Sequence, residues 1–216
     1  MVTIILLAMV AGFVALRLYS VLGKRTGHEQ TVAKPLEGTP RPVPALRPLP
    51  GAGGDAADAA EPAFAGDALQ GVRQIVAADP SFDAGRFLGG ARSAYGMILD
   101  AFWRGDEDEL ARLADAEVAS AFGEAIAQRK AEGHVLDNRL ISIEQAVIER
   151  AGVTGQTAFV TVRFRADIAA VTRDADGNVI AGSLSDAVTT DDLWTFSRNV
   201  RSSDPNWILT ETDEAA

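Results

Sequence analysis

The sequence predicts an α+β fold in which helices cover one face of a curved antiparallel sheet. Helix-type patterns fill residues 83–133, and strand-type patterns follow them to the C-terminus without another helix. Apart from Phe159, residues 157–168 alternate between apolar and polar side chains, which is the period of a strand with one face in a core and one in water. The dipeptide Asp176-Gly177 then marks a hairpin turn, because both residues tolerate positive φ.

Composition limits the domain count and the classes of partner. The chain has 216 residues, a net charge of −10 and no cysteine. That length suits one globular domain with extensions, and the lack of cysteine excludes a disulfide framework and a thiolate zinc site. From Phe82 onward 13 Lys and Arg residues stand against 23 Asp and Glu residues. An acidic domain repels nucleic acid, so we expect no nucleic-acid partner.

The first 23 residues are predicted to be a transmembrane anchor. Residues 2–22 are apolar apart from Arg17, and as a helix they span about 30 Å, the thickness of a bilayer core. Arg17 lies near the helix end, where its side chain can reach the headgroups. A cleaved signal peptide is the competing interpretation, but no basic residue precedes the apolar run. Lys24 and Arg25 follow it, which predicts an outside N-terminus and a cytoplasmic C-terminal domain.

Two short segments connect the anchor to the main domain. Residues 24–65 are predicted to be a disordered, Pro/Gly-rich tether, and its prolines favour an extended polyproline form. A ligand for a proline-binding groove is the alternative to a plain spacer. Residues 66–80 hold a short amphipathic helix with Ala68, Leu69, Val72, Ile75 and Val76 on its apolar face. We expect this helix to dock on the domain rather than to lie on lipid.

The main domain, residues 81–216, opens with a helix from Asp83 to Arg104. Glycines at positions 89, 90 and 96 are costly inside a helix, so we expect close backbone contact there. Asp106 is predicted to cap a short second helix, and Asp115 to cap a third.

Four strands are predicted to follow the helices. They cover about 136–149, 156–172, 179–199 and 207–212, with a turn over Gly152–Gly155 between the first two. About three helices would therefore cover a four-stranded sheet, and long curved strands of this kind form a cone with an apolar hollow.

No catalytic, metal or cofactor site is predicted. The acidic run 106–109 stands at a helix start, where capping explains it. Residues 174–178 lack the spacing of a calcium loop and are interpreted as a turn. Acid–base chemistry could use only Tyr95, Asp100 and Asp167, but Asp100 lies off the apolar stripe and Asp167 faces outward. We therefore expect a protein that is not an enzyme.

Five aromatic residues are the candidates for a pocket or a partner contact. Trp194 and Phe196 lie on the same face of one strand and could line a pocket mouth, although burial in the core is the favoured alternative. The full set is Tyr95, Phe102, Phe164, Trp194 and Phe196.

Four sequence blocks together resemble a known family. They are Phe87 to Phe102, Phe159 to Asp174, Asp192 to Phe196, and Asp204-Pro205-Asn206-Trp207. In this order they resemble the mitochondrial import inner-membrane translocase subunit 44 family, over nearly all of residues 82–212. The anchor and the tether stand where the mitochondrial proteins have a long charged region that recruits a chaperone, so the chain looks like a bacterial branch.

The resemblance implies a nuclear transport factor 2-like cone and a role as an adaptor. Its implied partners are the lipid bilayer and a translocase or chaperone protein at the bacterial inner membrane, on the cytoplasmic side. Three alternatives remain open at this point: a lipid- or small-molecule-binding cone, an enzymatic cone, and a periplasmic secretion scaffold with reversed topology. The oligomeric state is not predicted.

Overall fold

The computed structural model describes residues 63–215. The predicted anchor and nearly all of the predicted tether therefore lie outside the described residues. Within residues 63–215, no helix combines the length and the apolar character needed to cross a membrane.

In residues 63–215, four helices precede the main strands. They are α2 (Ala68–Ala78), α3 (Ala84–Arg104), α4 (Glu107–Leu113) and α5 (Ala116–Ala131). The predicted caps at Asp106 and Asp115 are confirmed, because each accepts a hydrogen bond from a backbone N–H in the first turn of its helix. Asp83, predicted as the first residue of a helix, caps α3 in the same way. Gly105 ends α3 in the left-handed conformation that favours glycine. The prediction of about three helices omitted the docked helix α2 from the domain.

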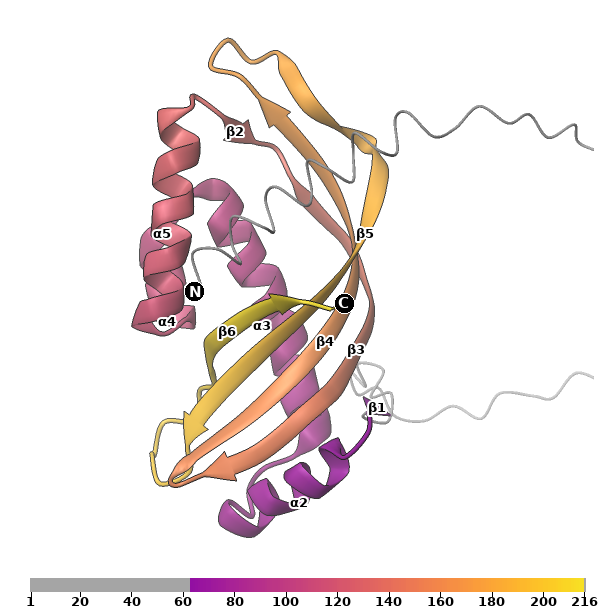
Figure 1. The fold of residues 1–216 in the computed structure, drawn as a ribbon, viewed down its shortest axis with the longest axis vertical. Coiled ribbons are helices and arrows are strands. Elements are labelled where there is room, and N and C mark those ends of the chain that lie inside the picture. Colours follow the sequence, from indigo (N-terminus) through magenta and orange to yellow (C-terminus); the bar gives the residue numbers. More distant parts are fainter. Residues whose placement is uncertain (1–62, 216) are drawn as a thin grey trace, which may run out of the picture. The chain divides into compact units, whose positions relative to one another are not determined.

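The sheet contains six strands rather than the four predicted (Figure 1). They are β1 (Ala63–Phe64), β2 (Val135–Leu136), β3 (Arg139–Thr154), β4 (Thr157–Arg173), β5 (Val179–Asn199) and β6 (Ile208–Glu214). Their order is β1-β3-β4-β5-β6, and β2 pairs with the far end of β4. All pairs are antiparallel except β1 with β3. The extra strands are two residues long, which is too short for an alternation to reveal them.

The first predicted turn between strands was wrong. Gly152 is not in a turn; it pairs with Phe159 inside the β3–β4 ladder, and the tight turn follows at Gly155. A methyl group on Gly152 would come within 2.9 Å of the Phe159 ring. The ring therefore occupies the space above the glycine, which also explains why Phe159 interrupts the alternation of β4.

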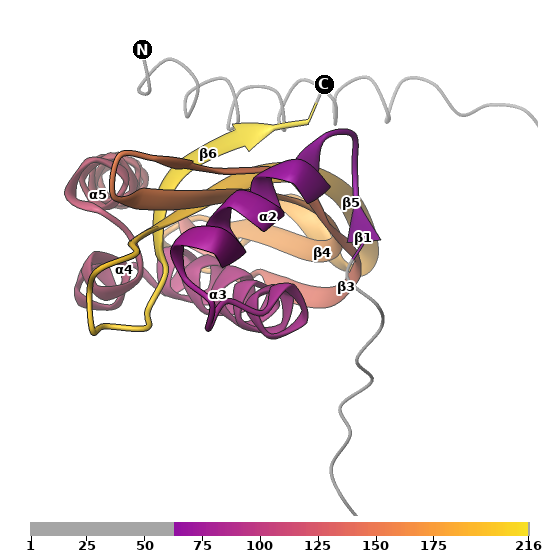
Figure 2. The same ribbon diagram turned by 90° about the horizontal axis from the view of Figure 1, so that it is seen from below.

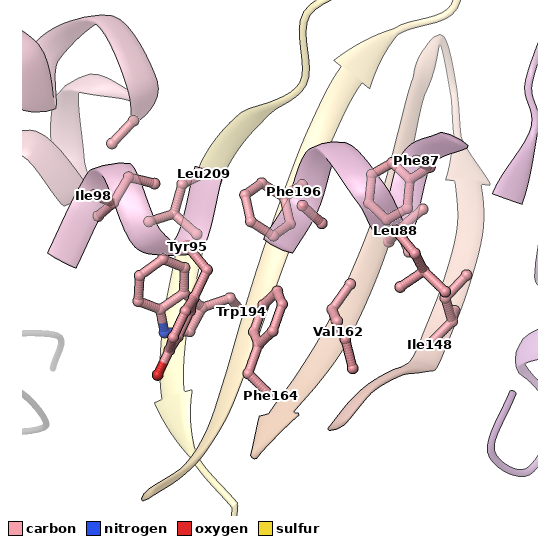
Figure 3. Close-up of a cluster of buried hydrophobic side chains, with 14 of the residues drawn as sticks. Phe87, Leu88, Tyr95, Ile98, Ile148, Val162, Phe164, Trp194, Phe196 and Leu209 are labelled. Carbon is pink, nitrogen blue, oxygen red and sulfur yellow. The ribbon is translucent and has the colours of Figure 1, made fainter. Parts of the chain in front are cut away.

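The helices cover one face of the curved sheet, as the sequence predicts. Figure 2 shows α3 and α4 along one side of the strands, with α2 crossing the lower end. Figure 3 shows the core between them, where aromatic and aliphatic side chains from α3, β3, β4, β5 and β6 meet. The inward residues of β4 are fully buried, Phe164 among them.

Helix α2 docks on β3, as predicted, but its apolar face is narrower than expected. Ala68, Val72 and Ile75 are buried, whereas Leu69 and Val76 remain about 40% exposed. The backbones of α2 and β3 approach each other closely at Gly71, where an added Cβ would stand 1.8 Å from the carbonyl oxygen of Ala151.

The predicted close contact at the α3 glycines was wrong. A Cβ on Gly89 or Gly90 would meet no atom within 4 Å, and one on Gly96 would make an ordinary contact of 3.6 Å with Leu140. Packing therefore does not explain these three glycines; Gly90 instead borders a surface groove.

Candidate functional site

One polar pair at the edge of the apolar core joins the buried Tyr95 to the partly buried Asp192. The hydroxyl of Tyr95 on α3 donates a hydrogen bond of 2.6 Å to Oδ2 of Asp192 on β5. The hydroxyl of Thr190 donates to the same oxygen at 3.1 Å. Glu214 of β6 stands directly opposite Asp192 in the strand pairing. The pair therefore joins a helix to the strand that pairs with the last strand of the sheet.

Burial is the largest influence on the pKa values of Asp192, Tyr95 and Glu214. It raises the pKa of Asp192 above its ordinary value, and the hydrogen bonds from Tyr95 and Thr190 offset part of that rise. Burial, followed by the charge of Asp192, raises the pKa of Tyr95. Burial also raises the pKa of Glu214, with further contributions from Asp192 and Asp213.

A tyrosine beside a partly buried acid can do acid–base chemistry in principle, but the Tyr95 ring is enclosed. It stacks on Phe164 with centroids 4.5 Å apart and lies 4.6 Å from the Trp194 ring. All three side chains are at most 3% exposed. In Figure 3 the Tyr95 hydroxyl and the Trp194 indole nitrogen lie at the same end of the cluster. Asp192 itself is partly exposed.

The other two residues considered for acid–base chemistry lie apart from Tyr95. Asp100 is exposed and pairs with Arg104 at 3.0 Å. Asp167 accepts a hydrogen bond of 2.6 Å from Thr189 on the exposed face. Sequence reasoning missed Asp192. Two-residue steps back from Phe196 through Trp194 reach Asp192 and then Thr190, so the alternation of β5 already pointed to it.

The five candidate contact residues lie mainly in the core. Tyr95, Phe164, Trp194 and Phe196 are buried, and Phe102 is half-buried against Phe122. Their burial gives them no direct contact with a partner in this conformation. Phe196 alone reaches a surface feature, because its ring forms part of the floor of a groove.

This groove has a volume of about 710 Å³ and three walls. Helix α3 forms one wall from Asp83 to Met97, the chain around α4 forms another from Glu109 to Leu113, and the β5–β6 loop closes the third from Asp204 to Ile208. We call it the aromatic groove.

The name reflects its floor. The Phe87 ring lies 4.9 Å from the Trp207 ring and 6.1 Å from the Phe196 ring, both edge-on. Phe82 packs against Phe87 and Trp207 at 5.8 and 5.6 Å. Phe82 and Trp207 are half-buried, so part of each ring remains open to a ligand.

Ion pairs hold the floor and the rim in place. Arg198 of β5 pairs with Asp79 at the end of α2, and its guanidinium lies 5.5 Å from the Trp207 ring centre. Hydrogen bonds with Ser81, followed by the charge of Arg198, lower the pKa of Asp79 despite some desolvation. Across the groove Arg112 pairs with Glu109 on α4. The rim therefore carries charges of both signs around an apolar floor.

Sequence analysis did not assemble this groove. Its floor combines the segment before α3, the first turns of α3, and the loop before β6, which only the tertiary fold brings together. One signal was present, because Asp204-Pro205-Asn206-Trp207 is one of the four blocks that carry the family resemblance.

Comparison with known proteins agrees with that resemblance. Residues 68–214 match the family described as "Tim44-like domain". A relative in Rickettsia prowazekii (strain Madrid E), described as an uncharacterized protein, is 24% identical over 145 residues. That alignment covers 67% of this chain and 59% of the relative, so the chain spans about three-fifths of the relative's length.

Two solved structures show lower similarity. The intermembrane space region of the chloroplast protein ARC6 aligns with a TM-score of 0.45 at 17% identity, over 63% of this chain and 99% of that one. A member of the NTF2-like family from Streptomyces avermitilis aligns with a TM-score of 0.33 at 18% identity, over 58% of this chain and 94% of that one.

Proposed function

Since the chain belongs to the Tim44-like domain family, we propose that it is a membrane-anchored, non-enzymatic adaptor of a bacterial inner membrane, whose cytoplasmic domain binds a protein partner linked to translocation or chaperone recruitment. The finer fold assignment, a nuclear transport factor 2-like cone, belongs to this proposal. It is supported by family membership and by helices that cover one face of a curved sheet.

The observation that carries the proposal is the contrast between the closed core and the open aromatic groove. The Tyr95 ring is enclosed by Phe164 and Trp194 and its hydroxyl already donates to Asp192, which supports a non-enzymatic role. The groove exposes parts of Phe82 and Trp207 beside the half-exposed Met97. Aromatic side chains and methionine are enriched in protein interfaces, so a partner's apolar side chains suit this floor.

Site-specific photocrosslinking tests the groove. A photoreactive residue replaces Met97, which lines the groove and is 46% exposed. The matched control replaces Leu69 on α2, which is 44% exposed and does not line the groove. In native membranes we expect the Met97 probe to trap one protein reproducibly and the Leu69 probe to leave it untouched. Identical products from both positions would rule out the groove as the partner site.

The membrane orientation needs its own experiment. The sequence predicts an outside N-terminus, so a fluorescent protein fused after Ala216 should fold in the cytoplasm, and alkaline phosphatase fused there should stay inactive. The opposite pair of results would support the periplasmic scaffold and contradict the adaptor proposed here.

A further inference from the structure

The upper part of β5 offers an unpaired strand edge. Within residues 63–215, Val179, Ala181–Ser183 and Val188–Thr190 pair with β4 on one side only, because β6 pairs with β5 only from Asp192 to Ser197 (Figure 1). The backbone N–H and C=O groups along the free side are available to another strand.

Apolar side chains gather along this edge. Val179, Ile180, Leu184 and Val188 are each 41–53% exposed, and they are four of the nine large apolar side chains that remain exposed in the described domain. An exposed apolar cluster of this kind marks an interaction site.

A bulge interrupts the edge. Ile168 pairs with Val188, and Ala170 pairs with Ser183, so one residue of β4 faces four residues of β5. Between the hairpin turn and this bulge the edge runs from Val179 to Ser183. It is itself irregular, because Ile180 is an extra residue between the Val179 and Ala181 pairs and Gly182 has a φ of 92°. Five residues of strand span about 17 Å. We call these five residues the arm edge.

The charges around the arm edge indicate the kind of strand that fits. Residues 178–185 carry no charged side chain, whereas Asp174 and Asp176 stand before them and Asp186 follows. Residues 174–190 contain no Lys or Arg. The preceding base, Arg173, is already paired with Asp137 at 3.2 Å. The edge is thus apolar in the middle and negative at both ends.

From these observations we propose that the arm edge binds an extended segment of a protein partner as an added strand, with apolar residues in its centre and Lys or Arg at both ends. Main-chain hydrogen bonds supply the affinity, and the flanking acids select the ends of the segment. A second copy of this chain fits poorly, because antiparallel pairing of two arm edges would bring Asp186 of each copy towards the acidic turn of the other. The inference does not depend on the aromatic groove, which other residues line.

A defined peptide tests the proposal on the full-length protein in detergent micelles. The probe is fluorescein-labelled Lys-Thr-Val-Thr-Val-Thr-Val-Lys, followed by fluorescence anisotropy. One control peptide carries Glu at both ends, and another is N-methylated at all six central residues, so that neither edge of the peptide strand can donate backbone hydrogen bonds. We expect the Lys-ended peptide to bind about tenfold more tightly than the Glu-ended one, since each exposed charge pair changes affinity about two- to fivefold. Added salt should reduce that preference.

The N-methylated peptide should lose binding. If it binds as well as the parent peptide, strand addition is excluded. Equal binding of the Lys-ended and Glu-ended peptides would show that the aspartates flanking the arm edge do not select the charge of the peptide ends. Both tests alter only the probe, so neither depends on whether a protein variant folds.

Protein variants then locate the site. The double substitution Asp176→Lys and Asp186→Lys should reverse the preference, so that the Glu-ended peptide binds better. Ile180→Asp should weaken the Lys-ended peptide, whereas Leu69→Asp on α2, with a similar starting exposure, should not. An unchanged preference in the double variant would overturn the proposal. So would a dimer that forms without peptide and is lost in Ile180→Asp, because the arm edge would then bind a second copy.

Discussion

The hydrogen bond between Tyr95 and Asp192 gives the most direct test of how the core tolerates a carboxylate. Tyr95→Phe removes one hydroxyl and keeps the ring that stacks on Phe164. A hydrogen bond to a charged group contributes about 1.5–3 kcal/mol to stability, against about 0.5–1.5 kcal/mol between neutral groups. We therefore expect the variant to lose about 2 kcal/mol at a pH above the raised folded pKa of Asp192, where this carboxylate is ionised.

The loss should depend on pH in a defined direction. The folded pKa of Asp192 is raised, so its stabilising contribution is complete below the unfolded pKa and is lost as pH rises through the folded pKa. Tyr95 donates to the ionised form and lowers that folded pKa, so its removal raises the pKa further. The deficit of the variant must then grow as pH rises through this range. Near pH 3, where Asp192 is protonated, we expect a deficit of about 1 kcal/mol or less.

Urea unfolding followed by tryptophan fluorescence measures the stability deficit of Tyr95→Phe at each pH, because Trp194 lies beside the Tyr95 ring. Ser197→Ala is the matched control, since the Ser197 hydroxyl forms a bond of 3.0 Å with the neutral Thr210 hydroxyl. Its cost should not follow the titration of Asp192. If Tyr95→Phe costs the same at every pH between 3 and 9, Asp192 is not the ionising partner and the reasoning fails.

Three further changes test other parts of the fold by the same unfolding assay. Gly71→Ala should destabilise by at least about 3 kcal/mol, because the new methyl group collides with the β3 backbone, whereas Gly90→Ala should stabilise by up to about 1 kcal/mol through helix propensity alone. Equal effects at the two glycines would contradict the packing described for α2. Arg198→Met should cost about 2 kcal/mol, since it leaves Asp79 without its cation in a largely buried position, and a neutral result would show that the pair contributes nothing. Glu214→Gln should raise stability near pH 7 and not near pH 3, because the folded pKa of Glu214 is raised and its contribution is lost as pH rises; the reverse order would contradict this assignment.

Local interactions explain why much of the fold was predictable. The caps at Asp106 and Asp115 depend on atoms three residues apart, so the sequence alone identifies them. The alternation of β4 likewise determines which side chains face the core. The prediction failed at Gly152, because a glycine inside a strand and a glycine in a turn look alike until the Phe159 ring is placed above it.

The candidate sites depend on contacts that local patterns do not encode. Tyr95 and Asp192 are 97 residues apart in the chain, and their hydrogen bond requires α3 to lie at one position along β5. The aromatic groove depends on Phe82, Phe87 and Trp207 arriving from separate segments. Sequence analysis found aromatic residues on core-facing positions and could not tell which of them the fold leaves partly open.

The two surfaces proposed here are linked by the division of β5. From Asp192 to Ser197 this strand has a neighbour on both sides and its inward side chains meet α3, and this half of β5 supplies Phe196 and Arg198 to the aromatic groove. From Val179 to Val188 it has one neighbour, and its apolar side chains are half-exposed. The amino-acid pattern is apolar in both halves, so hydrophobicity alone does not distinguish them. What distinguishes them is the short length of β6, which covers the second half of β5 and leaves the first half as a free edge.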